Sequence, residues 1–189
     1  MHWAVKTLLI VVAGAILGVL VTAAAVRQLP ASITNGPWTT SVAIGSPQSD
    51  PYTRAAEALH GLFALKRDET IYFTATTDDA GNSLDGRCSY EIRGEDPDAR
   101  WWSITVYGTD DFLIPNPEHR YSVAKTTVAR NANGSFDIRI GGSDRSPNWI
   151  PAGSGRFSLT LRLYNPGAVM TTLDPQVVAL PTLKRVSCP

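Results

Sequence analysis

The sequence predicts a mainly β domain, an antiparallel sandwich or barrel with one short amphipathic helix, preceded by an N-terminal transmembrane helix. Three observations favour this fold class. The chain begins with a long apolar run, later segments alternate apolar and polar residues, and Gly, Pro, Asn and Asp separate those segments. No long helical pattern lies between the alternating segments, which disfavours a parallel α/β sheet.

The apolar run from Leu8 to Val26 carries no charged side chain, and as a helix it nearly spans a hydrocarbon core of about 30 Å. Lys6 is the cytoplasmic charge expected of a signal anchor whose N-terminus stays inside. Ala23 to Ala25 also suit a cleaved signal peptide, but the run is longer than the apolar core of such peptides. We therefore expect residues 1–30 to be a membrane anchor or signal segment and residues 31–189 to be an extracytoplasmic domain.

Within this run, Gly14, Gly18 and Thr22 lie four residues apart on one side of the helix. Small residues at this spacing let two membrane helices approach closely, so the pattern predicts a homodimer contact, although apolar segments are rich in glycine in any case.

The charge balance excludes nucleic acid as a partner. The chain has 17 basic and 17 acidic residues, and without Lys6 and Arg27 the remainder has 15 basic against 17 acidic. A domain that binds nucleic acid carries a basic surface, which this composition lacks.

Residues 32–48 are rich in Gly, Pro, Ser and Thr and are predicted to be a linker or an irregular edge segment. Asp50 and Pro51 then provide an N-cap and a first helical residue. They predict an amphipathic helix that covers a sheet and ends near Leu65. Its apolar stripe consists of Tyr52, Ala55, Leu59, Leu62 and Phe63.

Alternation with a period of two predicts strands with one apolar and one polar face. The apolar face carries Ile71, Phe73, Ala75, Trp102, Ile104, Val106, Phe157, Leu159, Leu161 and Leu163. The opposite face carries Tyr72, Thr74, Thr76, Trp101, Ser103, Thr105, Tyr107, Ser158, Thr160, Arg162 and Tyr164. The turn residues 78–86 predict that residues 87–94 return as the partner of strand 70–77, and Asn133-Gly134 predicts the turn of a second hairpin, with positive φ at both residues.

Two cysteines, Cys88 and Cys188, follow the membrane segment. An even number on the oxidising side of a membrane predicts a disulfide between them. This bond would close a loop of about 100 residues, for which the chain-entropy model gives a ceiling of about 4.7 kcal/mol.

Six ordered segments carry a family resemblance, namely DPYTRAAEALHGLFAL, LDGRCSYEI, WWSITVYGTDDFLIPNPEHRYSV, NGSFDIRI, PNWIPAGSGRFSLTLRLYNP and LPTLKRV. From about Trp38 to its end, the chain resembles the family catalogued as domain of unknown function 1214, as a stand-alone bacterial member with an N-terminal membrane segment. The resemblance implies a jelly-roll-like β-sandwich. Larger relatives add domain of unknown function 1254, for which this chain has no room, so we expect no activity that needs that pairing. The family supplies no catalytic residues to carry over.

The residues alone assign no catalytic group. Neither GGSDR nor AGSGR has the spacing of a serine nucleophile motif. His60 is predicted to be packed beside the helix stripe and His119 to be a loop residue, which leaves few ligands for a zinc centre. The oxygen donors of residues 78–85 lack the pattern of a calcium loop and are interpreted as a turn. We therefore predict no metal and no cofactor.

Arg162 is the main candidate for ligand binding, since it shares a polar strand face with Tyr164. With Tyr72 and Tyr107 beside it, this face could hold a carboxylate, phosphate or sugar. Trp101 or Trp149 would supply an apolar platform. The alternative, which we favour on sequence grounds, is that Arg162 pairs with a carboxylate and locks a loop onto the sheet; the candidates are Asp110, Asp111 and Glu118.

The segment NWIP is interpreted first as a rigid corner. Asn148 would hydrogen-bond to the backbone, Trp149 would be buried, and Pro151 would fix the direction in which the chain leaves. These features predict a single-pass protein of a bacterial inner membrane with its C-terminal domain in the periplasm. A ligand-binding or envelope assembly module is the favoured function, and a small hydrolase acting on envelope lipid or glycan is the alternative.

Overall fold

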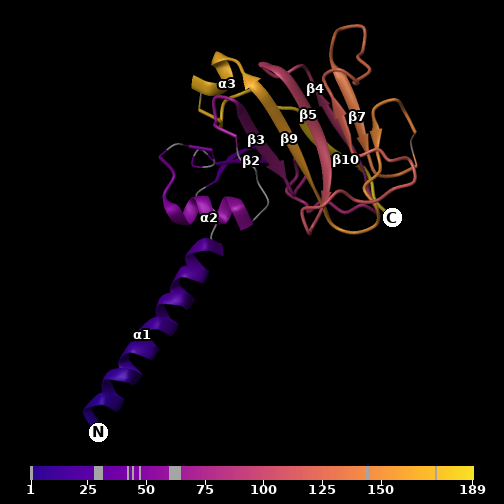
Figure 1. Cartoon of the computed structure of the whole chain (residues 1–189). Coiled ribbons are helices and arrows are strands. Elements are labelled where there is room, and N and C mark those ends of the chain that lie inside the picture. The colour runs from indigo at the N-terminus through magenta and orange to yellow at the C-terminus, as the bar shows by residue number, and fades with distance from the viewer. Residues whose placement is uncertain are drawn as a thin grey trace.

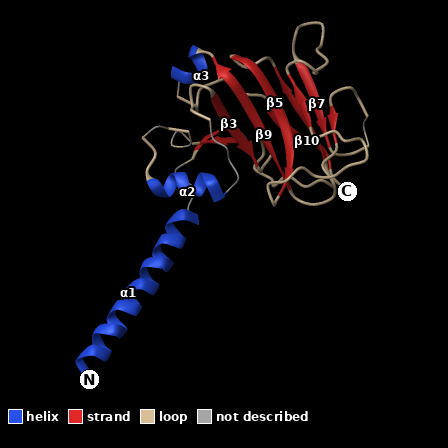
Figure 2. Ribbon diagram, in the orientation of Figure 1, coloured by secondary structure: helices blue, strands red, loops and turns tan. Residues whose placement is uncertain are grey.

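The computed structural model describes residues 2–27, 32–41, 43, 45–46, 48–59, 65–143, 145–172 and 174–189. Two β-sheets stack on each other, and an N-terminal helix projects away from them (Figure 1). Short helices lie at the margin of the strands (Figure 2). The prediction of a mainly β fold with an N-terminal apolar helix is confirmed.

The N-terminal helix α1 spans His2–Arg27. Its apolar stretch Trp3–Val26 has 24 residues, and the most apolar 18-residue window has a mean hydropathy of 2.7. None of that window is buried against the rest of the described chain. A core helix of a soluble protein would bury such residues. The length and composition of α1 therefore suit a membrane anchor or a signal segment.

The first sheet has six strands, all antiparallel, in the order β1-β2-β3-β9-β5-β6. They are β1 (Ile33–Asn35), β2 (Trp38–Thr40), β3 (Thr70–Ala75), β9 (Phe157–Pro166), β5 (Ala99–Gly108) and β6 (Ser122–Ala124). The predicted irregular edge segment thus contains two short edge strands. Trp38 anchors them, because its side chain is fully buried and its indole N–H donates to the Pro181 carbonyl at 2.7 Å.

The second sheet has four strands in the order β10-β4-β7-β8. They are β10 (Thr182–Ser187), β4 (Ser89–Gly94), β7 (Phe136–Ile140) and β8 (Trp149–Ile150). The pair β7–β8 is parallel, so the prediction of a purely antiparallel sandwich is wrong at this edge. Gly141 and Gly142 both have positive φ and turn the chain out of β7, which lets the two residues of β8 return in the same direction.

Both predicted hairpins are wrong, because their strands belong to different sheets. β3 lies in the six-stranded sheet and β4 in the four-stranded one, and β6 and β7 are separated in the same way. Gly86 lies where the chain passes from the first sheet to the second, and there it runs close to the backbone of residues 152–153. A Cβ at Gly86 would lie 2.5 Å from the carbonyl oxygens of Ala152 and Gly153. Between β6 and β7 a tight turn does form, but only Gly134 of the Asn133-Gly134 pair has positive φ.

The core lies between the two sheets. All the predicted apolar-face residues of β3, β5 and β9 are buried there, so the prediction of which residues face inward is confirmed. Two aromatic contacts join the sheets, Trp102 with Phe136 at 4.8 Å between ring centroids and Tyr90 with Phe157 at 5.6 Å. The polar face of β5 is not fully exposed to solvent, because Ser103 and Thr105 on that face are also buried.

The helix α2 spans Pro51–Leu59, and α3 spans Ala168–Thr172. The predicted N-cap of α2 is confirmed, since Asp50 Oδ1 accepts hydrogen bonds from the N–H groups of Tyr52 and Thr53 at 2.8 and 3.2 Å.

The predicted apolar stripe of α2 is wrong at Tyr52, which is 50% exposed, whereas Thr53 and Ala56 are buried. The helix lies beside α1 rather than across a sheet (Figure 1), so a different side of it is covered. His60, Leu62 and Phe63 lie outside the described residues.

Candidate functional site

Three rows of side chains cross β3, β9 and β5, which lie side by side in Figure 1, on the outer face of the six-stranded sheet. The central row is Tyr72, Arg162 and Ser103. The flanking rows are Thr74–Thr160–Thr105 on one side and Thr70–Tyr164–Trp101 on the other. We call these nine residues, together with Tyr107 on β5, the arginine face.

The Arg162 guanidinium lies between two tyrosines. Its Cζ is 5.9 Å from the ring centroid of Tyr72 and 5.2 Å from that of Tyr107, both within the range of cation–π attraction. Its Nη2 also donates to the Tyr107 hydroxyl at 2.7 Å. A guanidinium has five N–H donors, and this is its one hydrogen bond within the described chain, so several donors stay available to a ligand.

None of the predicted carboxylate partners pairs with Arg162. Glu118 forms an ion pair with Arg145 at 3.1 Å, and Asp110 accepts a hydrogen bond from the backbone of Phe112 at 3.1 Å. No ion pair joins Arg162 to a carboxylate among the residues that the structure describes. The expectation that Arg162 locks an acidic loop onto the sheet is therefore wrong.

The hydroxyl of Tyr72 occupies a crowded position on the arginine face. Burial, followed by the electrostatic effect of Tyr164, raises the pKa of Tyr72. The Thr70 hydroxyl lowers the pKa of Tyr72 by a smaller amount. The oxygen of that hydroxyl is buried and has no hydrogen bond of normal geometry. A phenol with a raised pKa stays protonated at neutral pH, so Tyr72 can donate a hydrogen bond to an anion.

An aromatic pair borders the arginine row. Trp101 and Tyr164 have ring centroids 5.3 Å apart, and both side chains are partly exposed. On the other border, the hydroxyls of Thr74 and Thr160 have no hydrogen-bond partner within the described residues. The face therefore combines a cation, free hydroxyls and an aromatic surface, which suits an anionic group attached to an organic body.

The comparisons with known proteins agree with this fold. The model of a family described as a protein of unknown function, DUF1214, matches residues 69–168, slightly more than half of the chain. The chain belongs to the DUF1214 family. This confirms the resemblance found in the sequence, and the matched segment contains β3, β5 and β9, which carry the arginine face.

Among solved structures, this DUF1214 protein is similar to the VPA0106 protein of Vibrio parahaemolyticus, with 22% identity, a TM-score of 0.62, and coverage of 74% of this chain and 36% of that one. A second similar structure is an uncharacterised protein from Burkholderia cenocepacia, with 16% identity, a TM-score of 0.40, and coverage of 62% and 29%. This chain thus spans about a third of the length of these neighbours. No curated protein matches it.

Trp149, the remaining candidate from the sequence, does not lie on the arginine face of this DUF1214 domain. It belongs to β8 in the other sheet, where it is buried and its indole N–H donates to the Gly141 carbonyl at 2.7 Å. Asn148 is also buried, and its amide bonds the backbone of Ala129 and Asp137. This segment forms the rigid corner that the sequence indicated.

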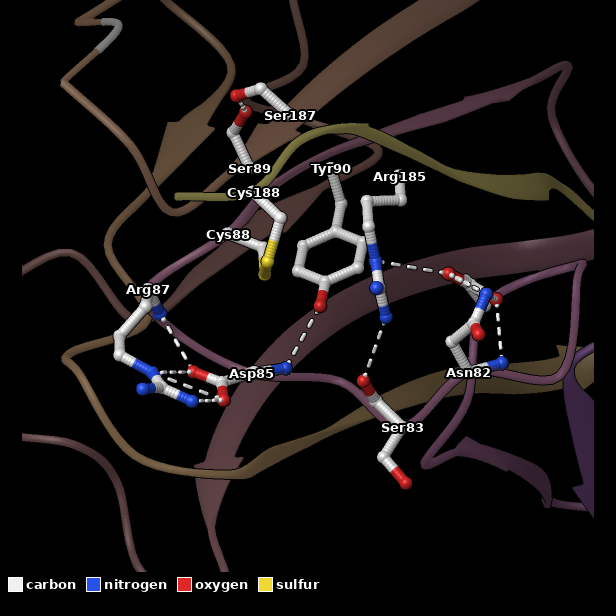
Figure 3. Close-up of a disulfide and its surroundings, with 11 residues drawn as sticks. Asn82, Ser83, Asp85, Arg87, Cys88, Ser89, Tyr90, Arg185, Ser187 and Cys188 are labelled. Carbon is white, nitrogen blue, oxygen red and sulfur yellow. Dashed lines mark hydrogen bonds and ion pairs between the residues drawn. A yellow bond between two sulfur atoms is a disulfide. The ribbon is translucent and has the colours of Figure 1, made fainter.

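The C-terminal strand of the DUF1214 domain is held by a set of contacts that we call the C-terminal clasp. The predicted disulfide Cys88–Cys188 is present, and Arg185 runs beside the Tyr90 ring, 5.7 Å from its centroid (Figure 3). Arg185 Nε also lies 3.3 Å from a carboxylate oxygen of buried Asp78.

The acidic turn contributes to this clasp as well. Asp78 accepts hydrogen bonds from the N–H groups of Ala80 and Asn82. The Asp79 N–H donates to the Leu183 carbonyl on β10, and the Asp79 carboxylate accepts a hydrogen bond from the Leu183 N–H. The interpretation of residues 78–85 as a turn is confirmed. Its carboxylates serve the C-terminal strand, a role that local sequence could not indicate because Arg185 lies about a hundred residues away.

Sequence reasoning also missed a cleft of about 370 Å³ formed by four turns. It is lined by Gly86, Arg87, Pro115, Asn116, Pro117, Glu118, Gly141, Gly142, Pro151, Ala152 and Gly153. Both charged residues of its lining already have partners, Arg87 with Asp85 at 2.6 Å and Glu118 with Arg145. The arginine face, whose cation keeps free donors, is therefore the stronger candidate site.

Proposed function

We propose that this protein is a membrane-anchored, extracytoplasmic domain that binds an organic anion on the arginine face. The observation that carries the proposal is Arg162, a partly buried guanidinium that lies between Tyr72 and Tyr107 with no carboxylate partner in the described chain. A charged group held in such surroundings gains free energy from an anionic ligand with oxygen acceptors. Carboxylates and phosphates have this chemistry.

The proposed location rests on two features of the chain. α1 is long and apolar enough to enter a bilayer, with Lys6 at its N-terminal end. Disulfides such as Cys88–Cys188 persist in oxidising compartments. Together they support a single-pass anchor in a bacterial inner membrane with the sandwich in the periplasm. Mass spectrometry of the membrane fraction tests the retained anchor, because a cleaved protein would lack α1.

The proposal also includes a strand connectivity and an oligomeric state. The first is that the two sheets follow jelly-roll connectivity, as the family resemblance implies. The second is a homodimer through Gly14, Gly18 and Thr22, where the described structure leaves open space around both glycines. Cross-linking of full-length protein in bilayers, compared with Gly14→Leu and Gly18→Leu variants, tests the dimer.

Anion binding is tested with full-length protein in dodecyl maltoside by fluorescence titration with acetate and with inorganic phosphate. Arg162→Gln should weaken binding by at least about tenfold while the melting temperature and circular dichroism stay close to wild type. Arg93→Gln is the matched control, because it removes the same charge from an exposed position on the other sheet. Equal binding by wild type and Arg162→Gln would contradict the proposed site.

A further inference from the structure

A continuous chain of contacts links the arginine face to the helices near the membrane segment. α2 lies beside α1, and Glu57 of α2 accepts a hydrogen bond from the Gly45 N–H at 3.1 Å. Gly45 packs so closely on Leu65 that a Cβ would lie 2.4 Å from the Leu65 carbonyl oxygen. The carbonyl of Lys66, the next residue, accepts a hydrogen bond from the Thr70 N–H at 2.9 Å, at the start of β3 and two residues before Tyr72. Tyr72 in turn lies beside Arg162.

The tether between α1 and the sandwich is short. Residues 28–32 separate Arg27 from Ile33, so these two positions lie at most about 22 Å apart at ~3.6 Å per residue.

The sheet register shows where this tether enters. Ile33 pairs with Thr40, the Thr40 hydroxyl bonds the Tyr72 carbonyl, and Tyr72 pairs with Arg162. Three strand spacings of ~4.8 Å add about 14 Å. Arg162 therefore stays within about 40 Å of the end of α1, so the surface of the bilayer that α1 would enter is never farther away than this.

The junction between α2 and the arginine face has a composition suited to a membrane interface. Tyr52 and Leu65 are 50% and 45% exposed, and Trp101 and Tyr164 are partly exposed on the face itself. Aromatic residues concentrate at the level of lipid headgroups. Arg67, whose N–H donates to the Gly45 carbonyl at 3.3 Å, adds a second partly buried guanidinium at this junction.

We infer that the anion bound by Arg162 is the phosphate of a lipid headgroup in the bilayer that holds α1, rather than a free solute. This inference rests on the proposed function, since it needs both the anion site and the membrane anchor. A guanidinium fork matches two phosphate oxygens, and neighbouring tyrosine hydroxyls donate to a third. The short tether favours a ligand that is permanently concentrated at the membrane surface.

The test compares two bilayers of zero net charge. Full-length protein is reconstituted in nanodiscs of phosphatidylcholine, which carries a phosphate, or of digalactosyldiacylglycerol, which does not. Glycerol 3-phosphate is then titrated into each. If lipid phosphate occupies the arginine face, the apparent affinity should be at least about tenfold weaker in phosphatidylcholine. Arg93→Gln should keep this difference, and Arg162→Gln should lose binding in both discs.

The outcomes separate the inference from the proposed function. Equal affinity in the two bilayers, abolished by Arg162→Gln, would overturn the lipid source but retain an anion site for free solutes. A failure to detect Arg162-dependent binding in the galactolipid discs would overturn both. A difference between bilayers that persists in Arg162→Gln would show that lipid acts elsewhere on the chain and would also overturn the inference.

Discussion

Removing the disulfide by Cys88→Ala and Cys188→Ala together should destabilise the sandwich without preventing folding. The two cysteines are separated by 100 residues, and the chain-entropy model gives about 4.7 kcal/mol for a loop of this size. Measured values are typically about 2–4 kcal/mol, so we expect a loss of about 3 kcal/mol. For a domain of this size, that corresponds to a fall in melting temperature of about 10 °C.

The folded state should survive, because β10 has other contacts. It pairs with β4 from Thr182↔Arg93 to Ser187↔Ser89, and the Arg185–Asp78 ion pair of the C-terminal clasp does not involve sulfur. The disulfide acts chiefly on the unfolded chain, so circular dichroism of the variant at low temperature should match that of wild type.

The assay is thermal unfolding of the full chain in detergent, with and without reductant. Reductant should lower the melting temperature of wild type to that of the double variant and leave the variant unchanged. A variant that melts together with oxidised wild type would refute the reasoning. So would two thiols that alkylate in native protein without reductant.

Two further predictions concern acidic side chains. Asp78→Asn should destabilise the domain by about 2–3 kcal/mol in denaturant unfolding, because it leaves Arg185 beside a buried neutral group. Asp85→Asn, which removes a solvent-exposed ion pair with Arg87, should shift the unfolding midpoint much less. Equal shifts for the two variants would contradict this contrast. The hydrogen bond from Arg93 lowers the pKa of Asp137 in the folded state. The ionised Asp137 therefore stabilises the fold at pH values above its unfolded pKa of about 3.9, and this stabilisation is lost as the pH falls through the lower folded pKa. Asp137→Asn should therefore flatten the stability profile between about pH 5 and pH 2, and an unchanged profile would oppose that assignment.

Much of the candidate site follows from local sequence. Because side chains alternate along a strand, the polar positions of β3, β5 and β9 could be assigned to one face before any pairing was known. Tyr72, Tyr107, Arg162 and Tyr164 then came together once these strands became neighbours. Trp149 did not join them, because nothing in its own segment shows which sheet it enters.

The errors share one cause. A tight turn between two alternating segments suggests a hairpin, yet β3 and β4 enter opposite sheets, and so do β6 and β7. The glycine that allows one of these crossings, Gly86, does so because of a backbone approach by Ala152 and Gly153, far away in sequence. Strand pairing is a contact between distant segments, and local turn chemistry does not determine it.

The sequence by itself determined the apolar N-terminal helix, the two faces of each long strand, the cap of α2 and the family, because these depend on composition and on periods of a few residues. Only the tertiary structure decided the order of strands, the partners of Asp78 and Arg185, and the absence of a carboxylate beside Arg162 within the described residues. These depend on which distant segments pack together, and that is a property of the whole chain rather than of any stretch of it.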